Sequence, residues 1–326
     1  ANIVGNTVKS GGRIDIGTIT TPELYISTKE VVRLTGTNSN LKIICDSGSS
    51  IILDNIRMVN VSDTAIELQG DNNQIALVGN SHIYSAFDAF TTNTNALVHI
   101  GYGTSVTFEG DGLLDVIQQS QHNEAAAIGG NANEKAGNIY CNLIHYEEQA
   151  DGTFLGTPGR IEGANMSGSG AGIGGGINAD GGLLVINNGG VFGTSVMGAG
   201  FGGGANGNGG TVILNGGMAN ATIRKNSSSA GNSGAAIGGG VNGNGGTMIY
   251  NGGTLRVHID NGYVSSAQGI GAGAGGSLSG IFENNTNLAI TPTNQNILEN
   301  APEIINGIPG MGSGNNNQNT GIVGAV

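Results

Sequence analysis

Short runs of four or five mostly apolar residues recur along the chain, and glycine, asparagine or aspartate bounds most of them. The clearest runs are "LLVIN" at 183–187, "TVILN" at 211–215 and "TMIYN" at 247–251. Apolar runs of this length are typical of buried β-strands, and the bounding residues are those that favour turns. The pattern therefore predicts an all-β chain built from many short strands.

The strand at 247–251 lies inside a longer repeat. "GAAIGGGVNGNGGTMIYNGG" at 234–253 returns as "GAGFGGGANGNGGTVILNGG" at 198–217 and, with more changes, as "GAGIGGGINADGGLLVINNGG" at 170–190. An irregular period of this kind is typical of solenoids with loops of variable length. We expect a parallel β-helix of about seven or more irregular rungs. Weaker copies lie upstream, and the first apolar residues of the seven aligned copies are Ile51, Ile75, Val106, Ile139, Leu184, Val212 and Met248.

Two further columns of this alignment carry structural predictions. The third strand position is apolar in every copy, so it is expected to face the core together with the first. The fourth position becomes asparagine in the later copies and precedes glycine in several, which is typical of a turn. If successive strands stack in register, these side chains form a ladder of amide hydrogen bonds. The predicted ladder consists of Asn142, Asn187, Asn215 and Asn251.

The second strand position, which is expected to point outward, is also apolar in the last three copies, at Val185, Ile213 and Ile249. Strands that are apolar on both faces are usually covered on both. The cover is either a part of this chain or a partner chain. We therefore take these three residues as a candidate assembly face.

The chain divides into three parts. Residues 1–40 lack the repeat and are expected to form a cap or the first rungs, which would protect an open edge. Residues 41–283 carry the repeats. Residues 284–326 are rich in asparagine and glycine, and we expect this extension to pack on the solenoid or on a neighbouring subunit.

Composition and charge argue against several classes of function. The chain has 63 glycines among its 326 residues, 10% charged residues and a net charge of −12. With only 11 Lys and Arg it lacks the basic patches of nucleic-acid-binding proteins. No apolar stretch approaches the roughly 20 residues needed to span a bilayer. Cys45 and Cys141 lie in apolar runs, which favours buried thiols over a redox pair or a metal site.

Residues that could carry chemistry are few. The turns "GDNN" and "EGDG" make Asp71, Glu109 and Asp111 candidate Ca²⁺ ligands, although solvated turn acids are the favoured interpretation. No other metal, cofactor or catalytic residue is expected. The bases fall at unrelated places in the aligned repeat, so no acid and base share a column. These bases are Arg57, Arg160, Arg224 and Arg256.

Exposed aromatic side chains are the usual means of binding a sugar without catalysis. The chain has no tryptophan, but "HIYSAFDAF" brings Tyr84, Phe87 and Phe90 close together in sequence. Packing in the core or within a loop is the favoured interpretation for this trio.

The order of the repeat, two glycine blocks with a strand between them, resembles the Gly-rich β-helix repeats of large secreted or surface proteins of Gram-positive, often clostridial, bacteria. Some proteins of this kind are labelled carbohydrate-binding-domain proteins. The resemblance covers residues 40–283 and implies a right-handed parallel β-helix outside the cell, with an adhesive, glycan-binding or structural use. It transfers no catalytic residue, because the matching positions belong to the scaffold. The insertion at 147–163 and the Asn-rich extension depart from the pattern.

These observations favour a non-enzymatic extracellular structural or adhesive surface protein that assembles into fibres through the solenoid ends and terminal segments. The alternative is a carbohydrate-binding module for acidic polysaccharide, with Ca²⁺ assisting. A polysaccharide lyase or a phage-type spike on the same scaffold ranks third.

Overall fold

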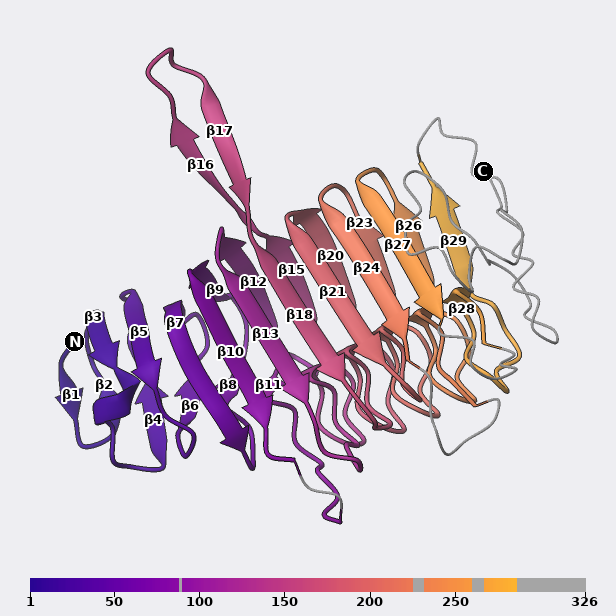
Figure 1. Ribbon diagram of the computed structural model, residues 1–326, viewed down its shortest axis with the longest axis horizontal. Coiled ribbons are helices and arrows are strands. Elements are labelled where there is room, and N and C mark those ends of the chain that lie inside the picture. The colour runs from indigo at the N-terminus through magenta and orange to yellow at the C-terminus, as the bar shows by residue number, and fades with distance from the viewer. Residues whose placement is uncertain (88–89, 225–231, 260–266, 286–326) are drawn as a thin grey trace.

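A computed structural model of the chain describes residues 1–87, 90–224, 232–259 and 267–285 (Figure 1). Almost all regular structure in these ranges is β-strand, and the one helical segment there is a short 3-10 turn, η1 (Ile16–Thr18). The strands lie side by side in long rows that run from the N-terminal to the C-terminal end of the described chain (Figure 1). The predicted all-β class is confirmed.

One row of strands, here called stack A, contains eleven strands among the described residues. Every neighbouring pair is parallel except the first, in which β1 runs antiparallel to β2. The order of stack A is β1 (Ile3–Val4), β2 (Thr7–Val8), β4 (Glu23–Ile26), β6 (Lys42–Cys45), β8 (Ile66–Leu68), β11 (Val98–His99), β14 (Ile128–Gly129), β19 (Ile173–Gly174), β22 (Phe201–Gly202), β25 (Ile237–Gly238) and β28 (Ile270–Gly271).

A second parallel sheet contains two more rows, which the long strand β7 (Ser50–Val61) joins. Stack B runs through β3 (Gly12–Asp15), β5 (Val32–Thr37), the first half of β7, β9 (Asn73–Val78), β12 (Ser105–Gly110), β15 (Asn138–Asn142), β20 (Leu183–Asn188), β23 (Thr211–Leu214), β26 (Thr247–Tyr250) and β29 (Ile281–Asn284). Stack C runs through the second half of β7, β10 (Asn80–Ser85), β13 (Leu113–Gln118), β18 (Arg160–Asn165), β21 (Gly190–Ser195), β24 (Met218–Ile223) and β27 (Thr254–Ile259).

From β6 to β27 the chain contributes strands to stacks A, B and C in that repeating order. Each strand pairs in parallel with the strand that occupies the same place one repeat later, as Val185 pairs with Ile213 and Ile213 with Ile249. These large parallel sheets are consistent with a β-solenoid. Residues 1–40 supply the first strands of stacks A and B, whereas of the predicted extension 284–326 only residues 284 and 285 belong to the described chain.

The core lies between the stacks and is built from the inward positions of every repeat. Ile139, Leu184, Val212 and Met248 are register neighbours in stack B and are all buried, as the alignment predicted. One step of the alignment is wrong: Val106 pairs with Asn73 rather than with Ile75. The shift is two residues, and because side chains alternate with a period of two, Val106 still faces the core.

The glycine blocks have a steric cause in stack A. From β14 to β28 each strand ends in a glycine with φ between 137° and 147°. A Cβ atom on Gly202 would lie 2.0 Å from the carbonyl oxygen of Gly238 in the next strand. A Cβ atom on Gly174 would likewise lie 1.9 Å from the carbonyl oxygen of Gly202. No side chain fits there, so the repeat needs glycine at this position.

One insertion interrupts the rows. Between β15 and β18 the chain forms an antiparallel hairpin, β16 (Ile144–Glu148) and β17 (Phe154–Pro158), which projects away from the stacks (Figure 1). Tyr146, Phe154 and Leu155 are between 57% and 66% exposed on it. This hairpin accounts for most of the sequence insertion at 147–163.

Candidate functional site

The four predicted ladder asparagines lie in one row at the end of stack B. Asn187 donates to the side-chain oxygen of Asn142 at 2.7 Å, Asn215 to that of Asn187 at 2.8 Å, and Asn251 to that of Asn215 at 2.7 Å. Asn285 adds a fifth member by donating to Asn251 at 2.8 Å. The row therefore reaches the last described residue.

Sequence reasoning missed a second asparagine ladder between stacks A and B. Asn178 donates to Asn133 at 2.8 Å, Asn206 to Asn178 at 2.9 Å, and Asn242 to Asn206 at 3.0 Å. All four have φ between 60° and 65°, a region that asparagine tolerates better than most residues. Each lies four positions after a stack A glycine, and this fixed offset is the signal that could have identified the ladder.

The candidate assembly face is a continuous row on the outer side of stack B. Val185 pairs with Ile213, Ile213 with Ile249, and Ile249 with Glu283 in the last strand. Val185 is 9% exposed, and Ile213 and Ile249 are partly exposed. The row is therefore apolar in its middle and acidic at its C-terminal end.

The outer face of stack B is basic at its N-terminal end, in a column two positions further along the strands. Arg13 in β3 pairs with Arg33 in β5, and Arg33 pairs with Ile52 in β7. Arg33 forms an ion pair of 2.9 Å with Asp54, and Arg13 donates from its Nε atom to the hydroxyl of Thr35 at 3.4 Å. The outer face of stack B thus begins with an arginine and ends with a glutamate.

The two terminal strands of stack B are edge strands within the described chain. β3 pairs with β5 alone, and β29 pairs with β26 alone. Gly12, Arg13 and Asp15 are exposed in β3, and Ile281 is 63% exposed in β29. An exposed edge strand offers backbone groups to which another strand can add. We take these two edges together as the candidate functional site.

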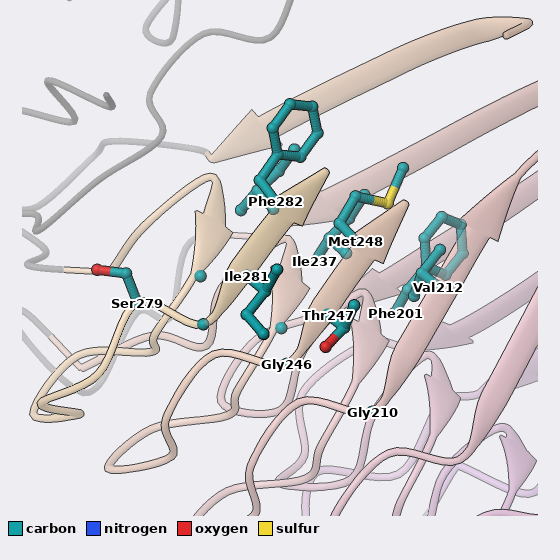
Figure 2. A pocket seen from close by; sticks show the side chains of 14 residues that line it. Phe201, Gly210, Val212, Ile237, Gly246, Thr247, Met248, Ser279, Ile281 and Phe282 are labelled. Atoms are coloured by element: carbon teal, nitrogen blue, oxygen red, sulfur yellow. The ribbon is translucent and has the colours of Figure 1, made fainter. Parts of the chain in front are cut away.

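An apolar cavity of about 280 Å³ lies beside the C-terminal edge, between the last strands of stacks A and B (Figure 2). Phe201 and Ile237 line it from stack A, and Val212, Met248 and Phe282 line it from stack B. Ile281 and Phe282 lie at its rim on β29, so the last strand is less tightly packed than the strands before it (Figure 2). The C-terminal end therefore presents apolar surface next to an edge strand.

Charge is distributed unevenly between the two ends. Residues 1–57 hold six of the 11 basic residues and five of the 23 acidic ones, whereas the described residues 267–285 hold one acidic residue, Glu283, and no Lys or Arg. The two ends therefore differ in the sign of their charge, which favours contact between unlike ends over contact between like ends.

The candidate Ca²⁺ ligands are not brought together. Asp71 lies in the turn before β9, whereas Glu109 is near the end of β12 and Asp111 lies in the turn after it. The length of a strand, on the order of 17 Å, therefore separates Asp71 from the other two. Among the described residues no group of three His, Cys, Asp or Glu side chains has the arrangement of a metal site.

A row of charged residues on stack C overturns one sequence expectation. Arg57, His82, Asp115 and Glu162 pair in register on four successive strands, so acids and bases do share a column. The alignment missed it because it followed the first strand of each repeat and not the second. A glycine stands three residues before each of the last three, at Gly79, Gly112 and Gly159, and this spacing was the available signal.

Short contacts link most of this row. His82 Nδ1 lies 3.2 Å from Asp115 Oδ2 and 3.3 Å from the hydroxyl of Tyr84, and Arg160 forms an ion pair with Glu162. Burial, and then the negative charge of Asp115, raise the pKa of the Tyr84 hydroxyl. Oδ1 of Asp115 is buried with no hydrogen-bond partner among the described residues. Glu162 and one oxygen of Asp115 are thus held by partners within the chain.

A separate groove of about 620 Å³ runs along the start of stack B. Its wall is backbone from several successive repeats, because glycine occupies the same place in each of them, as at Gly182, Gly210 and Gly246. Tyr102, 77% exposed, stands at one end, with the Lys135 ammonium 5.8 Å from its ring centroid. The groove offers an aromatic ring and a polar backbone surface to an extended ligand.

The aromatic trio does not pack as expected. Packing in the core or within a loop was expected; Phe87 is 66% exposed and Phe90 is 95% exposed, so neither packs in the core, whereas Tyr84 is partly buried. The structure confirms that Cys45 and Cys141 are free and buried.

Comparison with protein-family models, with curated proteins and with solved structures finds no match for this chain. Among the described residues no helix is long and apolar enough to cross a membrane.

Proposed function

We propose that the chain is a right-handed parallel β-helix that serves as a non-enzymatic structural or adhesive protein at the cell surface and assembles end to end into fibres. The extracellular location and the handedness rest on the resemblance of its glycine-rich repeats to those of bacterial surface proteins. The assembly rests on the geometry of stack B.

The observation that carries this proposal is the pair of exposed edges at the two ends of one row of parallel strands. β3 and β29 have the same strand direction and hold equivalent places in the repeat, because an unbroken series of parallel pairings connects them. A second copy placed end to end therefore meets the first with matching backbone geometry. Heterologous contacts of this kind do not close on themselves, so they produce a filament.

The rows of asparagines support the same proposal. A ladder that bonds each repeat to the next stiffens the module along its axis, and its last described member, Asn285, lies at the C-terminal end. Stiffness along one axis is what a fibre subunit or a surface stalk requires.

Negative-stain electron microscopy of the purified full-length chain, together with a variant that ends at Glu283, tests this proposal. We expect filaments from the full-length chain. Their loss in the shortened variant would assign the extension a linking role, and their persistence would assign the linkage to the solenoid ends alone. Single short rods in both samples would contradict the assembly.

The second candidate is a carbohydrate-binding module, and the groove beside Tyr102 favours it. An exposed aromatic ring at the end of an open groove is a stacking platform for the apolar face of a sugar. Glycan-array binding followed by titration tests this function. A micromolar affinity that Tyr102→Ala abolishes and Phe90→Ala preserves would support it, and binding to no glycan would contradict it.

A further inference from the structure

We propose that the groove along the start of stack B binds a linear polysaccharide of neutral sugars, which lies across the strands with one sugar beside each successive strand. This inference rests on the second candidate function, carbohydrate binding, and specifies the ligand, its direction and the residues that hold it. Tyr102 takes the first sugar, and the following sugars lie along the groove.

The groove crosses five successive strands of stack B at the same place. Its wall contains one register column of side chains, which consists of Asn138, Leu183, Thr211, Thr247 and Ile281. Thr247 and Ile281 lie side by side at the C-terminal end of this column (Figure 2). Neighbouring strands are about 4.8 Å apart, so the column is on the order of 20 Å long. A groove of this length accommodates several sugars in a row.

Backbone N–H groups without partners lie beside this column. Each of its last four members follows a glycine that also lines the groove, namely Gly182, Gly210, Gly246 and Gly280. Within the described chain, the N–H groups of these four glycines donate to no acceptor. A partly exposed N–H group without a protein partner is free to bind water or a ligand. The groove therefore offers one donor for each of four successive strands.

The spacing of these donors fits a polysaccharide. One pyranose unit of an extended polysaccharide advances by a length close to the distance between neighbouring strands, so successive sugars can each present a hydroxyl oxygen to one N–H group. An extended peptide advances by about 3.4 Å per residue and does not keep in step with the strands. The repeated spacing therefore favours sugars over a peptide.

The side chains of the groove suit the two kinds of surface that a sugar presents. Thr211 and Thr247 add hydroxyl groups, and Leu183 and Ile281 add apolar surface for the C–H faces of the rings. Tyr102 is 77% exposed, with the Lys135 ammonium 5.8 Å from its ring centroid. A cation over an aromatic ring favours one orientation of the ring, and the exposed ring can stack on a sugar.

The charges of the groove favour a neutral ligand. The charged side chains that line it are Lys135 and Asp180, whose charges balance. Oδ1 of Asp180 accepts a hydrogen bond from the backbone N–H of Asn208 at 2.8 Å. The chain as a whole has a net charge of −12, which repels a polyanion but not a neutral sugar polymer.

Oligosaccharides of graded length test this inference. Isothermal titration calorimetry on the full-length chain measures the binding of cello-, xylo- and chito-oligosaccharides from disaccharide to hexasaccharide, with oligogalacturonides of the same lengths as the charged comparison. Thr211→Val and Thr247→Val each remove one hydroxyl group and keep the branched shape of the side chain. Thr222→Val makes the same change on stack C and serves as the control. Circular dichroism verifies that each variant is folded.

For one neutral series we expect the hexasaccharide to bind at least about tenfold more tightly than the disaccharide, because each added sugar reaches a further strand. Thr211→Val and Thr247→Val are each expected to weaken hexasaccharide binding about fivefold through the loss of one hydrogen bond. Disaccharide binding, which is confined to the Tyr102 end, should be unchanged in both variants. The control should bind every length like the wild type.

The outcomes separate this inference from the function on which it rests. Binding that depends on Tyr102, but neither on chain length nor on Thr211 and Thr247, would overturn the polysaccharide groove and leave carbohydrate binding standing. Tighter binding of oligogalacturonides than of every neutral series would overturn the neutral class of ligand. A chain that binds none of these sugars, and none on a glycan array, would overturn both.

Discussion

Asn215 donates its side-chain amide to Asn187 Oδ1 at 2.8 Å, across two strands that are 28 residues apart in sequence. Asn251 repeats the contact one strand further on, at 2.7 Å. Each amide in the row thus donates to one neighbour and accepts from the other. Such a row couples successive repeats through side chains as well as through the backbone.

Removing the middle of this ladder should therefore loosen more than one repeat. We expect Asn215→Ala to lower the free energy of unfolding by about 1 kcal/mol, because two exposed hydrogen bonds are lost and water replaces them in part. Urea unfolding followed by circular dichroism measures the change. Asn220→Ala, which alters an asparagine on stack C that is not part of a ladder, serves as the control and should change stability by less than about 0.5 kcal/mol. Equal losses in both variants would contradict a special role for the ladder.

A substitution at the stack A glycines should be far more damaging. The Cβ of Gly202→Ala would lie 2.0 Å from a carbonyl oxygen of the next strand, so the strands must separate or the variant cannot fold. We expect a loss of more than about 4 kcal/mol, or no soluble protein. Gly103→Ala is the matched control: its φ is +83°, but no atom lies within 4 Å of the added Cβ. Its cost should be about 1 to 2 kcal/mol from backbone strain alone.

Comparable thermal unfolding of these two glycine variants would contradict the steric explanation of the glycine blocks. A large difference between them would show that the close approach of neighbouring strands, and not the backbone conformation alone, requires glycine in stack A.

The buried cysteines predict an alkaline limit to stability. Burial raises the pKa of Cys45 from 9.0 to about 12, and it raises the pKa of Cys141 as well. The folded state keeps both thiols protonated at pH values where the unfolded chain releases the protons. Their contribution to stability is therefore complete below about pH 9 and is lost as the pH rises toward 12.

Melting temperatures measured from about pH 8 to about pH 11 should fall more steeply for the wild type than for a Cys45→Ala, Cys141→Ala variant. The slope is the informative quantity, because the variant also loses packing. Identical slopes would contradict the pKa shifts. In the native state, both thiols should resist alkylation until the protein unfolds.

The parts of the structure that the sequence predicted are those where one residue type persists down a column. The stack B core and the ladder from Asn142 to Asn251 could be found because the same residue types recur at equivalent positions, and glycine blocks flank the last three copies at nearly constant distance. The columns repeat because each strand must fit its neighbours above and below. The alignment departs from the strand register at Val106, where the loop before the strand changes length, and at Asn142, which pairs with Asn188 rather than with Asn187.

The stack C row could not be found in this way, because its members change from one strand to the next. His82, Asp115, Glu162 and Phe192 occupy one outward column, where the fold demands no particular side chain. The hairpin before β18 also lengthens the sequence spacing between Asp115 and Glu162 in this column. Core packing constrains the inward positions of the sheet and leaves the outward ones free, so the repeat does not predict which side chains stand in this outward column.

The most direct test of the central claim is fibre diffraction from oriented assemblies of the full-length chain. If copies join end to end through stack B, the strands stack along the fibre axis, and a strong meridional reflection near 4.8 Å is expected. A spacing near 4.8 Å perpendicular to the axis would mean that copies associate side by side and would contradict the account, as would the absence of fibres.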